Sequence, residues 1–462
     1  MGNQPEFFRP VEGSTPARKK GVGEAYDRLE SALVLILGLS LPFTDFPLFL
    51  WRGFGIDLSH LVGGLLLIVA TGGSLLRRRA LPPISLLLYS IALLLVPFVP
   101  YLFHRLPGFS VPQFWKTLSH LAFLIGVFLA IGSSRLSGAW FRRMLTLLVS
   151  EAVLISLYGI WQTIAFSRGW PTGIGLLNRF AAHELRGKAG QWWRATATFE
   201  EPKWLAIYLL PPLCYAYGLA VRALREGRDR VRDCWIVAFL LITAGTVATV
   251  SLGEIPVMAI LSVAAFAHFV RLLRRKAQRI AALAGLAVLL FLFAAWMLSS
   301  RSVLSQLLQV RMAAEVTPRS AADSQLAPSW AYRENLRYAS MVFRESPWFG
   351  IGVGQFGPVG GVRGRDLGIP SELTRDGPWI GLGGLLAELG LAGLAALAML
   401  VLAILRPGSR TARPSKNPYG AMAGLLVAAV FLKETNAGFY VHFWTWFPLG
   451  IAALAARAGD GA

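Results

Sequence analysis

The chain has little of what metal and redox chemistry requires. Its 462 residues include two cysteines, Cys214 and Cys234, which excludes a disulfide framework and a cysteine-based metal site. The six histidines show no spacing typical of a zinc site. No glycine-rich phosphate loop opens a helix and no internal repeat is visible, so ATP-driven transport would need a separate subunit. We therefore expect neither a metal nor a cofactor.

Acidic residues are also scarce, with 25 Asp and Glu against 45 Lys and Arg and a net charge of +20. A nucleic-acid-binding protein gathers its basic residues on one solvated face, whereas here they separate long apolar stretches. Nucleic acid is therefore not an expected partner. With 55% hydrophobic and 15% charged residues, the composition excludes a soluble domain and predicts an integral protein of the lipid bilayer.

An apolar helix needs about 20 residues to cross the hydrocarbon core, and the sequence contains about twelve candidates. The expected fold is therefore all-α, a polytopic helical membrane protein. The first 28 residues are polar and lack the features of a cleavable signal peptide, so the first span is expected to stay in the membrane. The candidate spans are 29–50, 58–76, 82–102, 113–133, 144–166, 203–221, 234–252, 255–270, 280–299, 378–404, 419–434 and 438–457.

The basic residues between the spans predict the orientation of the chain. Lys and Arg accumulate in cytoplasmic loops, and here they cluster at alternate connections, namely 77–79, 135–143, 222–232, 271–279 and 406–416. Both termini are then cytoplasmic. The predicted order is a cytoplasmic tail (1–28), helices one to five (29–167), a first long outer loop (168–203), helices six to nine (204–299), a second long outer loop (300–377), and helices ten to twelve with a short cytoplasmic C-terminus (378–462).

The two outer loops hold more arginine than orientation explains. About nineteen of the 45 Lys and Arg fall on the outer side, nearly all in these loops, although long translocated loops tolerate positive charge without inverting the topology. Solvated surface charge is one interpretation. Binding of an anion at the outer membrane surface is the other.

The first outer loop runs into the next span through the segment 192–204. Its adjacent tryptophans suit the headgroup level, Pro202 suits the first turn of a helix, and Glu201 lies near the positive end of that helix dipole. Helix capping with an aromatic belt is one interpretation of this pattern. A polar cavity lined by Arg194 and Glu201 is the other.

The second outer loop contains an amphipathic helix at 330–344, which is expected to lie on the bilayer surface. An ordinary interfacial helix that meets anionic lipids explains the pattern as well as a lid over a binding site does. One stripe is apolar and another is basic at spacings of four and seven. The apolar stripe is Tyr332, Leu336, Ala339 and Phe343, and the basic stripe is Arg333, Arg337 and Arg344.

A glycine-rich turn follows this helix. Pro347 is expected to end the helix at Ser346. Gly350, Gly352 and Gly354 then allow a tight turn whose backbone N–H groups are available to an anion.

The order of these motifs resembles the O-antigen polymerase and ligase superfamily, which includes Wzy-like polymerases and WaaL-like ligases. The resemblance covers about 140–440 and is most specific over 332–393. The chain departs from the family pattern at two places. Ligase-like members carry a His-Asn pair where this chain reads TRDGPWIGLGG, and a Ser-Arg pair of the family is replaced here by Ser-Leu-Gly-Glu at 251–254. The matching residues are Arg194, Phe199, Glu201 and Pro202, then Arg333, Pro347, Gly352, Gly354 and Phe356, then the Ala-Glu-Leu-Gly-Leu-x-Gly motif at 387–393.

The resemblance implies a GT-C-like glycosyltransferase on the outer face of the bacterial inner membrane. The donor would be a polyprenyl-pyrophosphate-linked oligosaccharide and the acceptor a glycan hydroxyl. We expect a polymerase of O-antigen or exopolysaccharide repeat units, with a chain-length regulator as a further possible partner. A lateral groove between helices would admit the polyprenyl tail.

The candidate site residues follow from this chemistry. Departure of a pyrophosphate develops negative charge, which fixed guanidinium groups stabilise without a metal. A positioned carboxylate would act as general base. Glu201 is the first candidate, although the helix dipole weakens it as a base, and Asp376 is the alternative. The candidate cations are Arg194 and Arg333, followed by Arg337, Arg375, Arg179 and Arg186.

Two other functions stay open. A ligase would move the same donor glycan to lipid A core or another acceptor. A transporter or flippase of the lipid-linked oligosaccharide would bind the pyrophosphate without cleaving it, and is expected to carry charged or broken-helix positions at mid-membrane. The spans show little of either, because Asp45 and Glu151 lie close to predicted helix ends.

Overall fold

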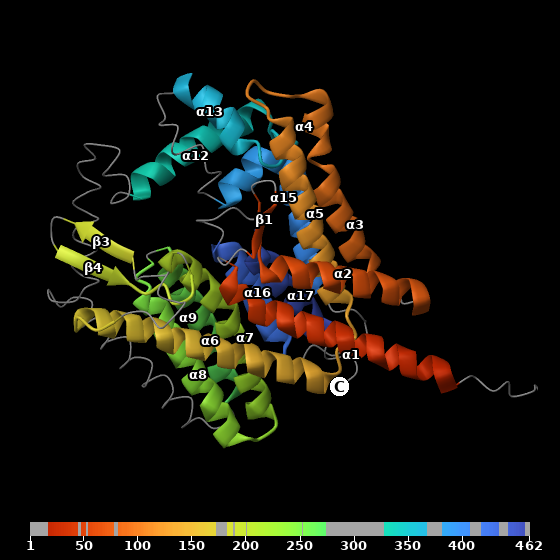
Figure 1. Ribbon diagram of the computed structural model, residues 1–462, viewed down its shortest axis with the longest axis vertical. Helices are drawn as coiled ribbons and strands as arrows, with labels where there is room; N and C mark the ends of the chain where they lie inside the picture. The colour runs from red at the N-terminus through yellow and green to blue at the C-terminus, as the bar shows by residue number, and fades with distance from the viewer. Residues whose placement is uncertain are drawn as a thin grey trace, which may run out of the picture.

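The computed structural model places most of the chain in a bundle of helices (Figure 1). Figure 1 shows α12 and α13 at the top and the β3–β4 hairpin at the left, whereas α1 begins at the lower right. The described residues are 17–44, 48–51, 54–77, 82–171, 183–187, 190–199, 201–251, 253–273, 328–366, 381–406, 417–433 and 442–457.

The elements follow one another along the chain in a simple order. They are α1 (Ala17–Ser40), the 3₁₀ helix η1 (Leu41–Phe43), β1 (Phe49–Trp51), β2 (Phe54–Ile56), α2 (Leu58–Arg77), α3 (Ile84–Leu95), α4 (Phe98–Phe103), α5 (Val111–Ser133), α6 (Gly138–Ser167), β3 (His183–Gly187), β4 (Gly190–Arg194), α7 (Pro202–Arg225), α8 (Asp229–Ala248), α9 (Glu254–Leu272), α12 (Pro328–Glu345), α13 (Phe356–Asp366), α15 (Gly381–Leu405), α16 (Gly420–Lys433) and α17 (Phe443–Arg457).

Among the described residues, seven helical segments are long and apolar enough to cross a membrane. They are Ile84–Phe103, α5, Gly138–Ala165 within α6, α7, α8, α9 and α15. Leu58–Ser74 and α16 are shorter apolar helices. The chain is thus a helical, multi-pass membrane protein. The predicted span 280–299 lies outside the described residues, so the count of twelve stays a prediction.

Two short antiparallel hairpins lie in the connections between helices. In the first, Phe49 of β1 pairs with Ile56 of β2. In the second, His183 of β3 pairs with Arg194 of β4, inside the predicted first outer loop. The sequence does not predict these pairings, because strands this short have no clear periodicity.

Contacts between helix ends define two ends of the bundle. Where α7 ends, Arg222 donates a hydrogen bond to the Tyr419 hydroxyl (2.8 Å), and the Tyr419 ring packs against Phe141 (5.1 Å between centroids). We call this the basic end. Where α7 begins, the Trp204 ring packs against His442 (4.9 Å), and we call this the aromatic end. The alternation of cytoplasmic and outer connections stays a prediction.

Helix α7 lies at the centre of the bundle and packs against α6, α8 and α16. Of the 18 residues in the most apolar stretch of α7, 94% are buried inside the protein. Pro211 and Pro212 lie inside this helix. Because a proline removes a backbone hydrogen bond and kinks a helix, α7 relies on its neighbours for much of its stability.

Candidate functional site

Arg194 is the last residue of β4 and is held against the end of α8. Its Nε donates a hydrogen bond to the carbonyl oxygen of Thr249 (2.9 Å), and the N–H of Ala195 donates to the carbonyl oxygen of Ala248 (3.1 Å). The side chain is partly buried. The guanidinium is therefore fixed beside the turn between α8 and α9, at the end of α8 opposite the basic end.

Backbone strain marks the same place. Ala197 and Val250 both have φ of 49°, and they are the non-glycine residues with positive φ in the part of the chain that the structure describes. Such conformations cost about 1–3 kcal/mol each and cluster at functional sites. Gln162 of α6 supports the strained segment, because its Oε1 accepts a hydrogen bond from the N–H of Ala197 (2.7 Å).

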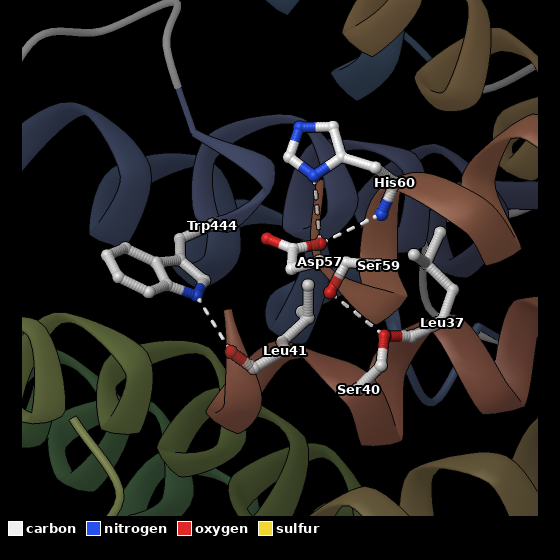
Figure 2. A network of polar contacts seen from close by, with 7 residues as sticks. All are labelled: Leu37, Ser40, Leu41, Asp57, Ser59, His60 and Trp444. Carbon is white, nitrogen blue, oxygen red and sulfur yellow. Dashed lines mark hydrogen bonds and ion pairs between the residues drawn. The ribbon is translucent and has the colours of Figure 1, made fainter. Parts of the chain in front are cut away.

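The chain after Arg194 crosses the aromatic end of the bundle. The hydroxyl of Thr198 donates a hydrogen bond to the carbonyl oxygen of Pro42 (2.9 Å), and the buried Phe199 ring packs against Trp444 (5.7 Å). Trp444 Nε1 in turn donates to the carbonyl oxygen of Leu41 (3.4 Å; Figure 2). Trp444 therefore joins the Arg194 segment to the end of α1.

Glu201, the favoured general base, is the N-cap residue of α7. It is exposed, and its carboxylate makes no capping hydrogen bond. Pro202 occupies the first turn of α7, as predicted. A general base needs a fixed orientation towards its proton, and exposure leaves Glu201 free to rotate. Its catalytic role stays a prediction.

Imidazole and ammonium groups gather around Trp444. The His442 ring stacks on Trp444 (5.4 Å), and the Lys433 ammonium donates a hydrogen bond to Thr445 Oγ1 (3.2 Å). We call this set the His–Lys cluster. It comes from four helices and the residue before α17, and consists of His60, His120, His442, Lys203 and Lys433.

An Asp–His pair borders the cluster where α2 begins (Figure 2). Asp57 Oδ1 accepts hydrogen bonds from the backbone N–H of His60 (2.9 Å) and from its Nδ1 (2.8 Å). The His60 ring then stacks against His120 of α5 (5.5 Å) and meets Phe443 edge-on (5.2 Å). Ser59, between the pair, bonds to Ser40 (3.0 Å), which ties α2 to α1.

Helix α12 is amphipathic, but its buried face differs from the predicted stripe. Tyr338, Ala339 and Val342 are buried, whereas Leu336 is 47% exposed. The Tyr338 ring packs on Phe356 (4.7 Å), and burial raises the pKa of its phenol. The face is therefore set by α13 and α15, on which α12 packs. The predicted contact of the stripe that includes Leu336 with the bilayer surface stays a prediction.

Two of the candidate cations, Arg333 and Arg337, lie on α12 and are exposed. Arg333 is exposed, and Arg337, with 62% of its side chain exposed, lies 3.8 Å from the Glu334 carboxylate. Arg194 is anchored on α8 instead. The contacts of the described residues therefore hold Arg194 in place. They do not place Arg333 or Arg337 next to Arg194.

The N–H groups of the glycine-rich turn already have hydrogen-bond acceptors within the protein. The Glu388 carboxylate accepts hydrogen bonds from the N–H groups of Gly354 (3.0 Å) and Phe356 (2.8 Å), and its backbone carbonyl accepts one from Gly352 (2.9 Å). The N–H of Gly350 donates to the carbonyl oxygen of Ser346 (3.0 Å). The prediction that these amides are available to a substrate anion is therefore corrected, because the Glu388 carboxyl accepts from Gly354 and backbone carbonyls accept from Gly350 and Gly352.

The structure gives fewer contacts for the other candidate site residues. Arg186 lies on β3, opposite Gln191 of β4. Arg179, Arg375 and Asp376 lie outside the described residues, so their roles stay predictions. For the part of the chain that the structure describes, no group of three or more His, Cys, Asp or Glu is arranged to hold a metal ion.

Sequence reasoning missed the His–Lys cluster and the Asp57–His60 pair. The histidines show no joint pattern in the sequence, because the members of the cluster lie up to hundreds of positions apart. One local signal was present: Asp57 followed by His60 at the start of an apolar run is the spacing at which an N-cap side chain meets the third residue of its helix.

The fold and the site together define a multi-pass membrane protein with a cationic, imidazole-containing site at one end of its helix bundle. No protein-family model matches the chain, and no curated protein matches it in sequence. Guanidinium and ammonium groups such as those of Arg194 and the lysines are the side chains that bind anions in proteins.

Proposed function

We propose that the protein is a glycosyltransferase that polymerises polyprenyl-pyrophosphate-linked oligosaccharide repeat units at the outer face of the bacterial inner membrane. The product would be an O-antigen or exopolysaccharide chain. The proposal extends the motif resemblance and includes a GT-C-like architecture. The lipid bilayer and a glycan acceptor are the implied partners.

The observation that carries the proposal is the strained anchor of Arg194. The Arg194 guanidinium is held by a carbonyl at the end of a membrane helix. It lies between Ala197 and Val250, whose positive φ angles lower the stability of the fold. Such a fixed cation stabilises a leaving pyrophosphate because it needs no reorganisation when negative charge develops. Surface charge that is merely solvated needs no anchor of this kind.

A small apolar cavity of about 20 Å³ lies between α1, α6, α7 and α17. It is too small to hold an isoprenoid chain, so the lateral groove for the polyprenyl tail stays a prediction. Its lining is almost wholly aliphatic, aromatic and proline side chains, namely Gly38, Leu41, Leu148, Tyr208, Pro211, Pro212, Tyr215, Trp444, Phe447 and Pro448.

The test is a reaction of purified protein with a synthetic polyprenyl-pyrophosphate repeat unit, without nucleotide or added metal. A ladder of longer lipid-linked products is expected. Transfer of one unit to a distinct acceptor would support the ligase instead. Unchanged donor under conditions in which the protein is folded would contradict both enzymes.

A transporter of the same lipid is the second candidate, and two observations favour it. Glu151 lies near the middle of α6, not near a helix end as the sequence predicts, and accepts a hydrogen bond from Tyr208 (3.2 Å). Helix α15 is broken at Gly390, where φ is 63° and ψ is −164°. Charged and broken-helix positions within a span are typical of transporters.

The two candidates separate in proteoliposomes that carry a fluorescent lipid-pyrophosphate oligosaccharide. A transporter moves the label between leaflets and leaves the pyrophosphate intact. A glycosyltransferase releases polyprenyl pyrophosphate, which thin-layer chromatography resolves from the donor. Movement without release would replace the first proposal by the second.

A further inference from the structure

The turn between α8 and α9 carries the acceptor that holds Arg194. Backbone carbonyls at the end of a helix have no partner within that helix. Here the end of β4 supplies donors for two of them. The N–H of Ala195 donates to the carbonyl oxygen of Ala248 (3.1 Å), and Arg194 Nε donates to that of Thr249 (2.9 Å). The position of the guanidinium therefore depends on the direction in which the Thr249 carbonyl points.

The backbone of this turn is strained. Val250 has φ of 49°, a left-handed conformation that a β-branched residue rarely adopts. Glycine is the usual residue in this conformation after a helix, because it has no Cβ to clash. A strained residue persists only where the surrounding structure holds it. Contacts from outside α8 are therefore needed to keep the turn in this shape.

Glu254, the first residue of α9, supplies such a contact. Its carboxylate accepts a hydrogen bond from the Ser251 hydroxyl, and the N–H of Ser251 donates to Thr249 Oγ1 (3.2 Å). The Thr249 hydroxyl donates to the carbonyl oxygen of Thr246 (2.7 Å), which fixes this side chain against α8. A continuous path of hydrogen bonds therefore leads from Glu254 through Ser251 and Thr249 to Arg194.

The path from Glu254 is shielded from water. Glu254 is 1% exposed, Ser251 is 4% exposed and Thr249 is fully buried. A buried hydrogen bond to a carboxylate is strong, because water does not compete for it. Glu254 also lies in the first turn of α9, where the helix dipole favours a negative charge. The carboxylate is thus placed to support the turn from inside the protein, not to touch a substrate.

We propose that Glu254 is a positioning residue for Arg194. Its carboxylate holds the α8–α9 turn in the shape that presents the Thr249 carbonyl to the guanidinium. This inference rests on the proposed glycosyltransferase function, in which Arg194 stabilises the pyrophosphate leaving group. A small displacement of the turn would move the cation away from the developing charge, so turnover would fall although Glu254 does not contact the donor.

The first test compares Glu254→Leu with Glu254→Gln in the polymerisation reaction. Leucine removes the acceptor for the Ser251 hydroxyl, whereas glutamine keeps an oxygen that accepts it. Turnover should fall about 10- to 10²-fold in Glu254→Leu, the effect of a misplaced catalytic group. It should stay within about threefold in Glu254→Gln, because the hydrogen bond is kept. Wild-type turnover in Glu254→Leu, or an equal fall in both variants, overturns the proposal.

The Michaelis constant separates positioning of Arg194 from a loss of donor binding. The KM for the lipid donor should stay within about threefold in Glu254→Leu, because the lost interaction acts on charge that develops in the transition state. Rates are expressed per folded protein, as measured by size-exclusion chromatography in detergent. A rise in KM that accounts for the whole loss, with unchanged kcat, would contradict the positioning role.

A double-mutant cycle shows whether Glu254 acts through Arg194. Once Arg194 is replaced by alanine, Glu254→Leu should lower turnover by less than about threefold, because the group that it positions is gone. Glu388→Gln is the matched control, a buried carboxyl whose hydrogen bonds lie in the turn after α12. Its effect should be the same with and without Arg194. An undiminished effect of Glu254→Leu in the Arg194→Ala background overturns the proposal.

Hydrogen–deuterium exchange tests the support of the turn without an activity assay. The Ala195 amide, which donates to Ala248, is expected to exchange at least about tenfold faster in Glu254→Leu and at the wild-type rate in Glu254→Gln. The Gly354 amide, which donates to Glu388, should keep its wild-type rate in both variants. Unchanged exchange at Ala195 in Glu254→Leu overturns the proposal.

These outcomes distinguish a failure of the positioning role from a failure of the proposed function. If the folded wild type does not elongate the donor, the glycosyltransferase function fails, and exchange at Ala195 still decides whether Glu254 holds the turn. If the wild type is active and Glu254→Leu matches it in turnover and in exchange, only the positioning role fails.

Discussion

Glu388 and Gly354 are joined across 34 positions of the chain by a hydrogen bond from a backbone N–H to a carboxylate, 3.0 Å long. The same carboxylate accepts from Phe356 (2.8 Å) and is 1% exposed. The turn after α12 is therefore closed on α15 by the buried Glu388 side chain. This lock fixes the elements that cover the bundle near α5.

Replacement of Glu388 by Gln should destabilise the protein by about 1–3 kcal/mol, because the amide turns an N–H donor towards a backbone donor and leaves a buried group unsatisfied. Thermal unfolding in detergent measures the change. Glu334→Gln on the outer part of α12 is the matched control, since Glu334 makes only a long 3.8 Å contact to Arg337. Equal stability of the two variants would contradict the lock.

Gly350 and Gly390 should not tolerate a side chain. Both have positive φ, 67° and 63°, and an added Cβ would clash with the backbone of Glu388 and of Trp348, respectively. Alanine at either position is expected to cost more than about 2 kcal/mol, from the left-handed conformation and the backbone clash together. Gly424→Ala is the control, because nothing lies within 4 Å of the place its Cβ would take. Its melting temperature should not fall.

Arg194→Ala should lower turnover of the lipid donor about 10²- to 10³-fold, the usual loss when one fixed group that stabilises a leaving charge is removed. Arg194→Lys should recover only part of the rate, since an ammonium does not reproduce the guanidinium geometry. Arg230→Ala, an exposed arginine of α8 at the basic end, is the control. Full activity of Arg194→Ala would remove this residue from the site.

Glu226 should contribute to stability in a pH-dependent way. A hydrogen bond from Arg222 holds the pKa of the Glu226 carboxyl below its ordinary value. A depressed folded-state pKa means that the contribution is present above the unfolded pKa and is lost as the pH falls through the folded value. Because Glu226 is partly exposed, solvent screening keeps the effect small, below about 1 kcal/mol.

The measurement is the melting temperature of wild type and Glu226→Gln between pH 7 and pH 3. The difference between the two should shrink as the pH falls. A constant difference would show that the ion pair is not its source.

The membrane class and the helical fold could be predicted because both depend on composition and on runs of apolar residues, which are local. The start of α7 at Pro202 and the end of α12 before Pro347 were also predictable, since proline acts on its own turn. The residues with which α12 packs on the protein, Tyr338, Ala339 and Val342, were not predictable, because α13 and α15, which lie elsewhere in the chain, determine that face.

The site was predicted only in part for the same reason. Arg194 stands out in the sequence through its place before a span, and the structure gives it an anchor. The His60 ring, which bonds to Asp57, packs against His120 and Phe443, and these two residues lie on other helices. No pattern within one segment indicates that these side chains meet.

The bond from Trp444 to Leu41 spans 403 positions of the chain. During synthesis, α1 and Leu41 are therefore made long before Trp444, which donates the hydrogen bond to the Leu41 carbonyl. The segment that follows Arg194 can reach its final arrangement only after α17, which carries Trp444, has entered the bilayer. A chain that ends before α17 would therefore lack the contacts that join α1 to this segment.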